Sequence, residues 1–411
     1  MFSGNTKICV QCKGYRRLCG LRRCLLSSSS IYRSKAVSLV ERGYIEGSTP
    51  PTVIVGERGY PLVRVYFGVP PGIKGEKASF YDNPNEWIDK LNLEDVIDLR
   101  SSLILVAMHK LNVYTVPMIV NVELLLAGVS LKPVDTEVVV EKFIRKSILL
   151  DSIVPPLGPS ILARNIRVTG NPNLPKRLEK IIDDDLRAFD AVIELYNDGT
   201  DFYTIARAFS LGLLGLKNNR KAVPTRWSIT AVDQSIGNHL LSALKLNPPI
   251  SNTLVFYNKN LYNKYLVILA PGTYRAIWIE VWHPSSAFNP SSKIEYLVVE
   301  EFPASRYTVM DGGYIAARTS ILEYLHKMNR QAKVAIIREI LPQYIYSVGS
   351  WQIRLAVKQA LEKGPIMRNP TVYELKEFIK TKMNIPAEAL DKVLEFIYGL
   401  KQRKLEEFIN K

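Results

Sequence analysis

The chain has 411 residues, of which 47% are hydrophobic, so it is long and apolar enough to bury a large core. Its 54 Lys and Arg residues outnumber its 39 Asp and Glu residues, and the resulting formal charge of +15 favours polyanionic partners such as nucleic acid or acidic membrane surfaces. No apolar run reaches the roughly 20 residues of a membrane helix, and arginines break the apolar stretch near the start. We therefore expect a globular cytoplasmic protein that does not insert into a membrane.

The first 35 residues form a basic segment that carries eight Lys or Arg residues, no acidic residue and all four cysteines of the chain. Four thiolates within so short a segment predict a structural Zn²⁺ site, and Gly14 and Gly20 permit the tight turns that such a site needs. An iron–sulfur cluster and a redox pair at the first two cysteines are the alternatives. The predicted zinc ligands are Cys9, Cys12, Cys19 and Cys24.

Basic residues alternate with these cysteines, so the segment is a candidate DNA-binding module. In the alternative interpretation, the arginines only neutralise the thiolates and acidic groups of the neighbouring core. The candidate DNA-binding residues are Arg16, Arg17, Arg22 and Arg23.

The middle of the chain predicts an α+β fold, because strands and helices come in groups. Apolar and β-branched runs predict a hairpin at residues 52–55 and 62–67, and helical spacing recurs at 92–110, 176–196 and 203–214. Four further strands are predicted between residues 252 and 302, with short breaks that suit an antiparallel meander. Later helices are predicted at residues 315–329, 351–363, 371–382 and 387–398.

The predicted architecture is a large mixed core with an antiparallel sheet and helices, preceded by the zinc module and followed by helices and a tail. Its four segments are 1–35, 36–365, 366–400 and 401–411. In the last segment, Gln402, Leu405 and Phe408 stand three residues apart and Ile409 follows. On one helical turn the apolar side chains of Leu405, Phe408 and Ile409 converge, and Gln402 stays free to form a hydrogen bond. This pattern resembles the motif by which proteins dock on the replication sliding clamp (PCNA). Ile409 stands where that motif prefers a second aromatic residue, and an amphipathic helix end is the alternative interpretation.

Several core strings resemble the Nre family of archaeal DNA-repair proteins, and the resemblance covers nearly the whole chain. The most specific string is VPTRWSITAVD, and the set is VGERGYP (55–61), RNIRVTGNPN (164–173), FSLGLLGLKNNRKAVPTRWSITAVDQSIG (209–237) and REILPQY (338–344). The resemblance implies a cytoplasmic role in the DNA-damage response, a zinc finger carried by the four cysteines, and clamp binding through Gln402, Leu405 and Phe408. It implies no catalytic residue.

Residues 227–233 alternate like a half-buried strand, and Asp233 is placed to cap a following helix. A strand end beside a helix N-terminus is a usable phosphate or nucleotide site, and a core strand with a capped helix is the structural alternative. The candidate residues of this core pocket are Arg226, Trp227, Thr230 and Asp233.

Carboxylates elsewhere leave open a metal-dependent nuclease or other phosphoester hydrolase, with Asp183, Asp185, Glu280 and His283 as its candidates. Consecutive aspartates on a helix diverge, so a solvated acidic helix face is the preferred interpretation of residues 183–185. Glu300 and Glu301 in a strand point to opposite faces and cannot act as a pair. Neither a phosphate-binding P-loop nor a dinucleotide-binding glycine motif is present, so the sequence does not indicate an ATP-driven motor. The main hypothesis is a clamp-tethered repair factor that engages DNA, and a purely structural adaptor is a third possibility.

Overall fold

The computed structural model describes residues 7–14, 16, 18–20, 36–40, 43–119, 122–301 and 311–399. The chain divides into two compact units, which are described separately below. The first unit comprises residues 1–24, 240–346 and 353–411, and the second comprises residues 25–239 and 347–352. The α+β class predicted from the sequence is confirmed, whereas the predicted boundaries of the four segments stay a prediction.

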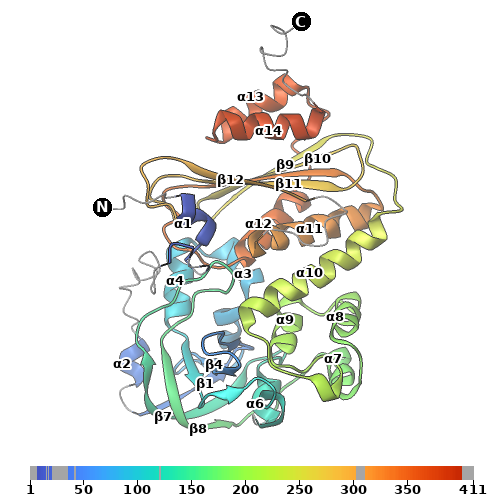
Figure 1. Cartoon of the computed structure of the whole chain (residues 1–411). Coiled ribbons are helices and arrows are strands. Elements are labelled where there is room, and N and C mark those ends of the chain that lie inside the picture. Colours follow the sequence, from blue (N-terminus) through green and yellow to red (C-terminus); the bar gives the residue numbers. More distant parts are fainter. Residues whose placement is uncertain are drawn as a thin grey trace, which may run out of the picture. The chain divides into compact units, whose positions relative to one another are not determined.

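The first unit contains a six-stranded mixed sheet in the order β12-β11-β13-β10-β9-β14. Figure 1 shows α13 and α14 on one face of this sheet and α11 and α12 on the other. Both faces are therefore covered, and this explains why β10, β11 and β13 are buried along almost their whole length. The strands are β9 (Leu254–Asn260), β10 (Asn263–Ala270), β11 (Arg275–Trp282), β12 (Glu295–Glu301), β13 (Lys333–Ile340) and β14 (Met367–Arg368). The helices are α1 (Lys7–Cys12), α11 (Gly312–Met328), most of α12 (Trp351–Glu362), α13 (Val372–Lys382) and α14 (Ala387–Tyr398).

The predicted antiparallel meander is wrong, although its four strands exist. β9 pairs with β10 and β11 pairs with β12 in antiparallel fashion, but β13 lies between β10 and β11 and runs parallel to β11. A parallel neighbour requires a crossover connection, which the chain between β11 and β13 supplies with β12 and α11. Short breaks between strands were therefore not sufficient to define the strand order.

The second unit contains another six-stranded mixed sheet, in the order β1-β7-β8-β5-β4-β2, and a small sheet of β3 and β6. The predicted hairpin is confirmed in part: β2 pairs with β4 in antiparallel register, but the second predicted strand is divided at Arg64 into β3 and β4, and β3 pairs with β6. The strands are β1 (Tyr44–Thr49), β2 (Val53–Val55), β3 (Leu62–Val63), β4 (Val65–Val69), β5 (Ile104–Ala107), β6 (Leu111–Asn112), β7 (Val134–Arg145) and β8 (Ser160–Val168).

The helices of the second unit include the short α2, which packs on its large sheet through Ala36 and Val40. Its α-helices are α2 (Ala36–Val40), α3 (Pro84–Lys90), α4 (Leu93–Ser101), α5 (Val116–Ile119), α6 (Val122–Ala127), α7 (Lys176–Asp183), α8 (Ala188–Asn197), α9 (Phe202–Ser210) and most of α10 (Thr225–Leu244). Two 3₁₀ helices are η1 (Gly75–Asp82) and η2 (Lys217–Asn219). None of the helices in the described ranges has the length and apolar character needed to cross a membrane.

Two helices and one strand that were predicted in this unit differ in the structure. The helix expected at residues 92–110 ends at Ser101, because residues 104–107 form the buried strand β5 between β4 and β8. The helix expected at 176–196 is broken into α7 and α8. The strand expected at 227–233 is helical, since α10 begins at Thr225 and buries Ile229, Val232 and Ile236 at helical spacing. Asp233 therefore lies inside α10 and does not cap it.

Candidate functional site

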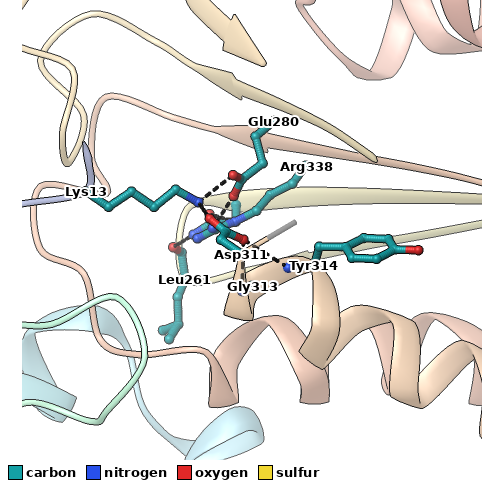
Figure 2. A network of polar contacts seen from close by, with 8 residues as sticks. Lys13, Leu261, Glu280, Asp311, Gly313, Tyr314 and Arg338 are labelled. Atoms are coloured by element: carbon teal, nitrogen blue, oxygen red, sulfur yellow. Dashed lines mark hydrogen bonds and ion pairs between the residues drawn. The ribbon is translucent and has the colours of Figure 1, made fainter. Parts of the chain in front are cut away.

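The cysteine segment is joined to the first sheet by a buried lysine. Helix α1 ends at Cys12, and Lys13 follows with a left-handed backbone (φ 48°) and only 8% exposure. Its ammonium Nζ lies 2.6 Å from Glu280 Oε2 and also pairs with the carboxylate of Asp311 (Figure 2). A lysine is almost never buried unless it is paired, and here two carboxylates meet one ammonium.

Glu280 and Arg338 complete what we call the ion network, which consists of Lys13, Glu280, Asp311 and Arg338. Arg338 Nη1 donates to the second oxygen of Glu280 at 2.9 Å, and its Nε donates to Asn263 Oδ1 at 3.0 Å. Glu280 on β11 and Arg338 on β13 are register partners in the parallel pair, so the sheet itself places them side by side. The network contains two cations and two carboxylates, and it is therefore electrically balanced.

Asp311 has a second task, because its side chain caps helix α11. Its Oδ1 accepts the backbone N–H groups of Gly313 at 3.0 Å and Tyr314 at 3.2 Å. Burial alone would raise the pKa of Asp311, but Lys13 and the Tyr314 N–H outweigh burial and lower this pKa below its ordinary 3.8. Burial alone would lower the pKa of Lys13, yet Asp311 and Glu280 raise it above 10.5. Both groups are therefore charged at neutral pH.

Two cation–π contacts add to this attachment. Lys13 Nζ lies 5.2 Å from the ring centroid of Trp282, and Lys7 Nζ lies 5.8 Å from that of Tyr296. Strand β12, which carries Tyr296, also contacts α1. The ion network and these contacts together fix the orientation of the helix that carries Cys9 and Cys12.

The described cysteines differ in exposure: Cys9 is half-buried, Cys12 is buried and Cys19 is exposed. Cys9 and Cys12 stand one turn apart on α1, which suits two ligands of one ion. Gly14 and Gly20 have positive φ angles of 78° and 74°, and the predicted tight turns are thereby confirmed. Within the described ranges no three His, Cys, Asp or Glu residues form a metal-binding group, and the fourth predicted ligand, Cys24, lies outside them. The zinc site stays a prediction.

The candidate DNA-binding arginines are only partly described. Arg16 is exposed, and its positive charge also lowers the pKa of Asp311. Arg17, Arg22 and Arg23 lie outside the described residues, as do the clamp-motif residues Gln402, Leu405, Phe408 and Ile409. These two assignments stay predictions.

In the second unit, the start of α10 is bound to the end of β2 and to the loop that follows it. Thr225 Oγ1 accepts the backbone N–H of Val55 at 2.8 Å. Arg226 forms an ion pair with Asp151, and its Nε lies 3.9 Å from Glu57. Two strings that the sequence singled out separately, VGERGYP and VPTRWSITAVD, therefore meet in one place.

The four residues of the predicted core pocket have different environments. Trp227 is 46% exposed and its ring lies 5.2 Å from that of Tyr60. Thr230 donates to the carbonyl of Arg226 within its own helix at 3.3 Å, and Asp233 is fully buried. Arg226 and Trp227 therefore meet the loop after β2, whereas Thr230 and Asp233 lie further along α10. A phosphate or nucleotide site here stays a prediction.

The candidate nuclease residues are engaged in other contacts or exposed. Asp183, Asp184 and Asp185 are exposed, and Asp185 accepts the backbone N–H of Lys217 at 2.7 Å. His283 Nε2 lies 2.9 Å from Glu339, and Glu280 belongs to the ion network. These residues are divided between the two units, and no metal-binding group was found among the residues that the structure describes.

Glu300 is exposed and Glu301 is buried, so their predicted opposite directions are confirmed. Glu301 accepts from Tyr274 at 3.0 Å and from Arg318 at 3.0 Å. Burial, and then the charge of Glu301, raise the pKa of Tyr274 far above its ordinary value. This carboxylate is thus a structural acceptor in the core.

The sequence did not indicate five residues that belong to the ion network or contact the start of α10. They are Asp311 and Arg338 in the network, and Asp151, Glu57 and Tyr60 beside Arg226 and Trp227. Arg338, Glu57 and Tyr60 stand within strings that had been singled out, but the strings gave no indication of their contacts. Only pairing of distant segments brings them to Lys13 or to α10, and a local motif carries no information on such pairing.

Together, the two mixed sheets and their helices define an α+β protein in which Lys13 attaches helix α1 to the sheet of the first unit. A family model described as "Archaeal Nre, N-terminal" matches residues 18–289, and one described as "Archaeal Nre, C-terminal" matches residues 301–408. The chain therefore belongs to the archaeal Nre family, and the resemblance inferred from the core strings is confirmed.

Three curated relatives agree with this assignment. The DNA repair protein NreA of Archaeoglobus fulgidus is 35% identical over 362 residues, which are 87% of this chain and 89% of the relative. The DNA repair protein NreB of the same organism is 32% identical over 404 residues, covering 98% and 100% of the two chains. The DNA repair protein NreA of Haloferax volcanii is 31% identical over 361 residues, covering 82% and 83%. The comparison with solved structures gave no match.

Proposed function

We propose that this chain is a DNA-repair factor that binds DNA and is recruited to the sliding clamp through its carboxy-terminal segment. The observation that carries the proposal is membership of a family whose curated relatives are named DNA repair proteins and match this chain over most of its length. The charge of +15 supports a polyanionic partner. The expected cytoplasmic location is part of the proposal.

The clamp contact would be made by Gln402, Leu405, Phe408 and Ile409, which follow the end of α14. Gly399 ends that helix with a left-handed backbone (φ 72°), and the motif follows it in the sequence. The apolar side chains would fill a pocket of the clamp, and the glutamine would bond at its rim.

Calorimetric titration of the full chain with purified clamp tests this contact. Replacing Leu405 and Phe408 by Ala removes the apolar contact and is expected to weaken binding at least about 100-fold, since each buried side chain contributes about 2 kcal/mol. Glu406→Gln and Glu407→Gln change the same segment outside the motif and serve as controls. Equal affinity of the double Ala variant and the wild type would refute clamp recruitment through this segment.

The proposal includes one structural Zn²⁺ held by Cys9, Cys12, Cys19 and Cys24, which would fold the basic segment. Elemental analysis of the purified chain is expected to find one zinc per molecule. Cys9→Ser with Cys12→Ser should lose it, whereas Ser27→Ala with Ser28→Ala should retain it. Metal-free wild type would refute the site.

A further inference from the structure

Three segments of the second unit that are distant in the sequence adjoin at its surface: residues 56–64, 108–115 and 217–227. The backbone joins them, because Val113 N donates to Pro61 O at 3.0 Å and Ala222 N donates to Val113 O at 2.8 Å. The first two segments also pair as β3 and β6. Their relative positions are therefore set by main-chain hydrogen bonds.

Each of the three segments presents one large aromatic side chain to solvent. Tyr60 is 41% exposed, Tyr114 is 55% exposed and Trp227 is 46% exposed. Tyr60 and Trp227 contact each other at a tilt of 47°, a geometry that leaves part of each ring uncovered. Exposing aromatic rings to water is unfavourable in free energy. A group of such rings at the surface therefore indicates an interaction site.

The same three segments are strongly basic, with seven Lys or Arg residues and a single acidic residue, Glu57. Arg58, Lys110 and Lys221 are exposed, and none of them pairs with a carboxylate in the described part of the chain. Lys221 Nζ lies 5.5 Å from the ring centroid of Tyr114, and Lys110 Nζ lies beside Gly59. Each cation thus stands next to an aromatic-bearing turn.

The base of this surface is held rigidly. Arg226 pairs with Asp151 and lies close to Glu57, and Thr225 accepts from Val55, so the residue before Trp227 and the loop before Tyr60 are both fixed. Such attachment reduces the conformational entropy that the surface loses when a ligand binds. Arg226 is therefore a positioning residue, while Arg58, Lys110 and Lys221 remain available to an anion.

We propose that the surface formed by Tyr60, Tyr114, Trp227, Arg58, Lys110 and Lys221, called here the aromatic surface, binds single-stranded DNA. Unpaired bases stack on exposed aromatic rings, and neighbouring cations bind the phosphates between them. A duplex hides the base faces inside its stack, so the aromatic rings would have no partner in it. The inference rests on the proposed function and specifies the form of DNA that the protein engages.

Fluorescence anisotropy with the full chain and a labelled oligothymidine tests the assignment, with a duplex and an RNA of equal length as competitors. Tyr114→Ala with Trp227→Ala is expected to weaken single-strand binding at least about tenfold, because each stacked base contributes measurably to affinity. Tyr373→Ala, which changes a 73% exposed tyrosine of α13, is the matched control and should leave affinity unchanged. Thermal melting of each variant verifies that it is folded.

The charges are tested separately by replacing Arg58, Lys110 and Lys221 with Gln. The slope of log affinity against log salt concentration should fall by about 2, since each phosphate contact in a single strand contributes about 0.7. Replacing the exposed Lys77, Lys180 and Arg187 by Gln removes the same charge elsewhere in the unit and should leave the slope unchanged.

The outcomes separate this inference from the function on which it rests. Wild type that binds no DNA refutes both DNA engagement and the aromatic surface. Wild type that binds DNA, but whose affinity does not change in the double Ala variant, refutes only the aromatic surface. Preference for the duplex or for RNA over the oligothymidine also refutes the assignment to single-stranded DNA.

Discussion

The ion network of the first unit and the aromatic surface of the second use charge in opposite ways. Lys13 and Arg338 are buried and matched by Glu280 and Asp311. Arg58, Lys110 and Lys221 are exposed and have no such partners among the described residues. Charge that is neutralised in the interior holds segments together, whereas unneutralised charge at the surface is available to a polyanion. The basic residues of this chain therefore have two separate uses.

The largest expected effect comes from removing one carboxylate of the ion network. Glu280→Gln removes the carboxylate that pairs with Arg338 and one of the two that pair with Lys13, while both cations stay buried. We therefore expect a loss of about 3 kcal/mol in the free energy of unfolding. Urea denaturation followed by circular dichroism measures it. Glu300→Gln changes an exposed carboxylate of neighbouring β12 and should cost less than about 0.5 kcal/mol. If Glu280→Gln lowered the free energy of unfolding by no more than this control does, the network would not stabilise the fold.

A smaller effect is expected in the pH dependence of stability. Because the pKa of Asp311 is lowered in the folded state, its stabilising contribution is present above its unfolded pKa near 3.8 and is lost as the pH falls through the lower folded value. Because the pKa of Lys13 is raised, its contribution is lost only as the pH rises through a value above 10.5. Lys13→Met removes the main cause of the Asp311 shift.

Urea midpoints of the two proteins between pH 5 and pH 2.5 measure this difference. The acid-induced loss of stability should be smaller in Lys13→Met than in the wild type, although the variant is less stable at neutral pH. Lys90→Met removes an exposed lysine that pairs with Glu86 and should leave the acid dependence unchanged. An identical acid dependence in Lys13→Met and the wild type would show that Lys13 does not cause the lowered pKa of Asp311.

The smallest expected effect concerns the single acidic residue of the aromatic surface. Glu57 is half exposed and lies 3.9 Å from Arg226, which keeps Asp151 as its main partner. Glu57→Gln removes repulsion of phosphates, so affinity for oligothymidine should rise about twofold, with stability changed by less than about 0.5 kcal/mol. Anisotropy at low salt measures it, and Glu179→Gln on the exposed part of α7 is the control. A fall in affinity would mean that Glu57 itself contacts the ligand.

The comparison also shows why the site was only partly predictable. The sequence identified Lys13 as one of several basic residues between the cysteines, but Glu280 lies 267 positions away and Asp311 lies 298 positions away. Trp227 was assigned to a strand, since residues 227–233 alternate over a span too short to distinguish a strand from a helix. Its contact with Tyr60 depends on the packing of α10, which no local pattern encodes.

The family, the α+β class and the clustering of all cysteines in a basic segment could be read from the sequence, because these depend on local composition and on recognisable strings. The sequence also indicated most of the later helices, since apolar spacing over three or more turns is decided by residues close in the chain. Tertiary structure alone decided that β13 enters the sheet beside β11 and that Lys13 reaches two carboxylates. It also decided that three distant turns share one surface. These contacts join residues far apart in sequence, so they are selected by the burial and pairing of the whole fold.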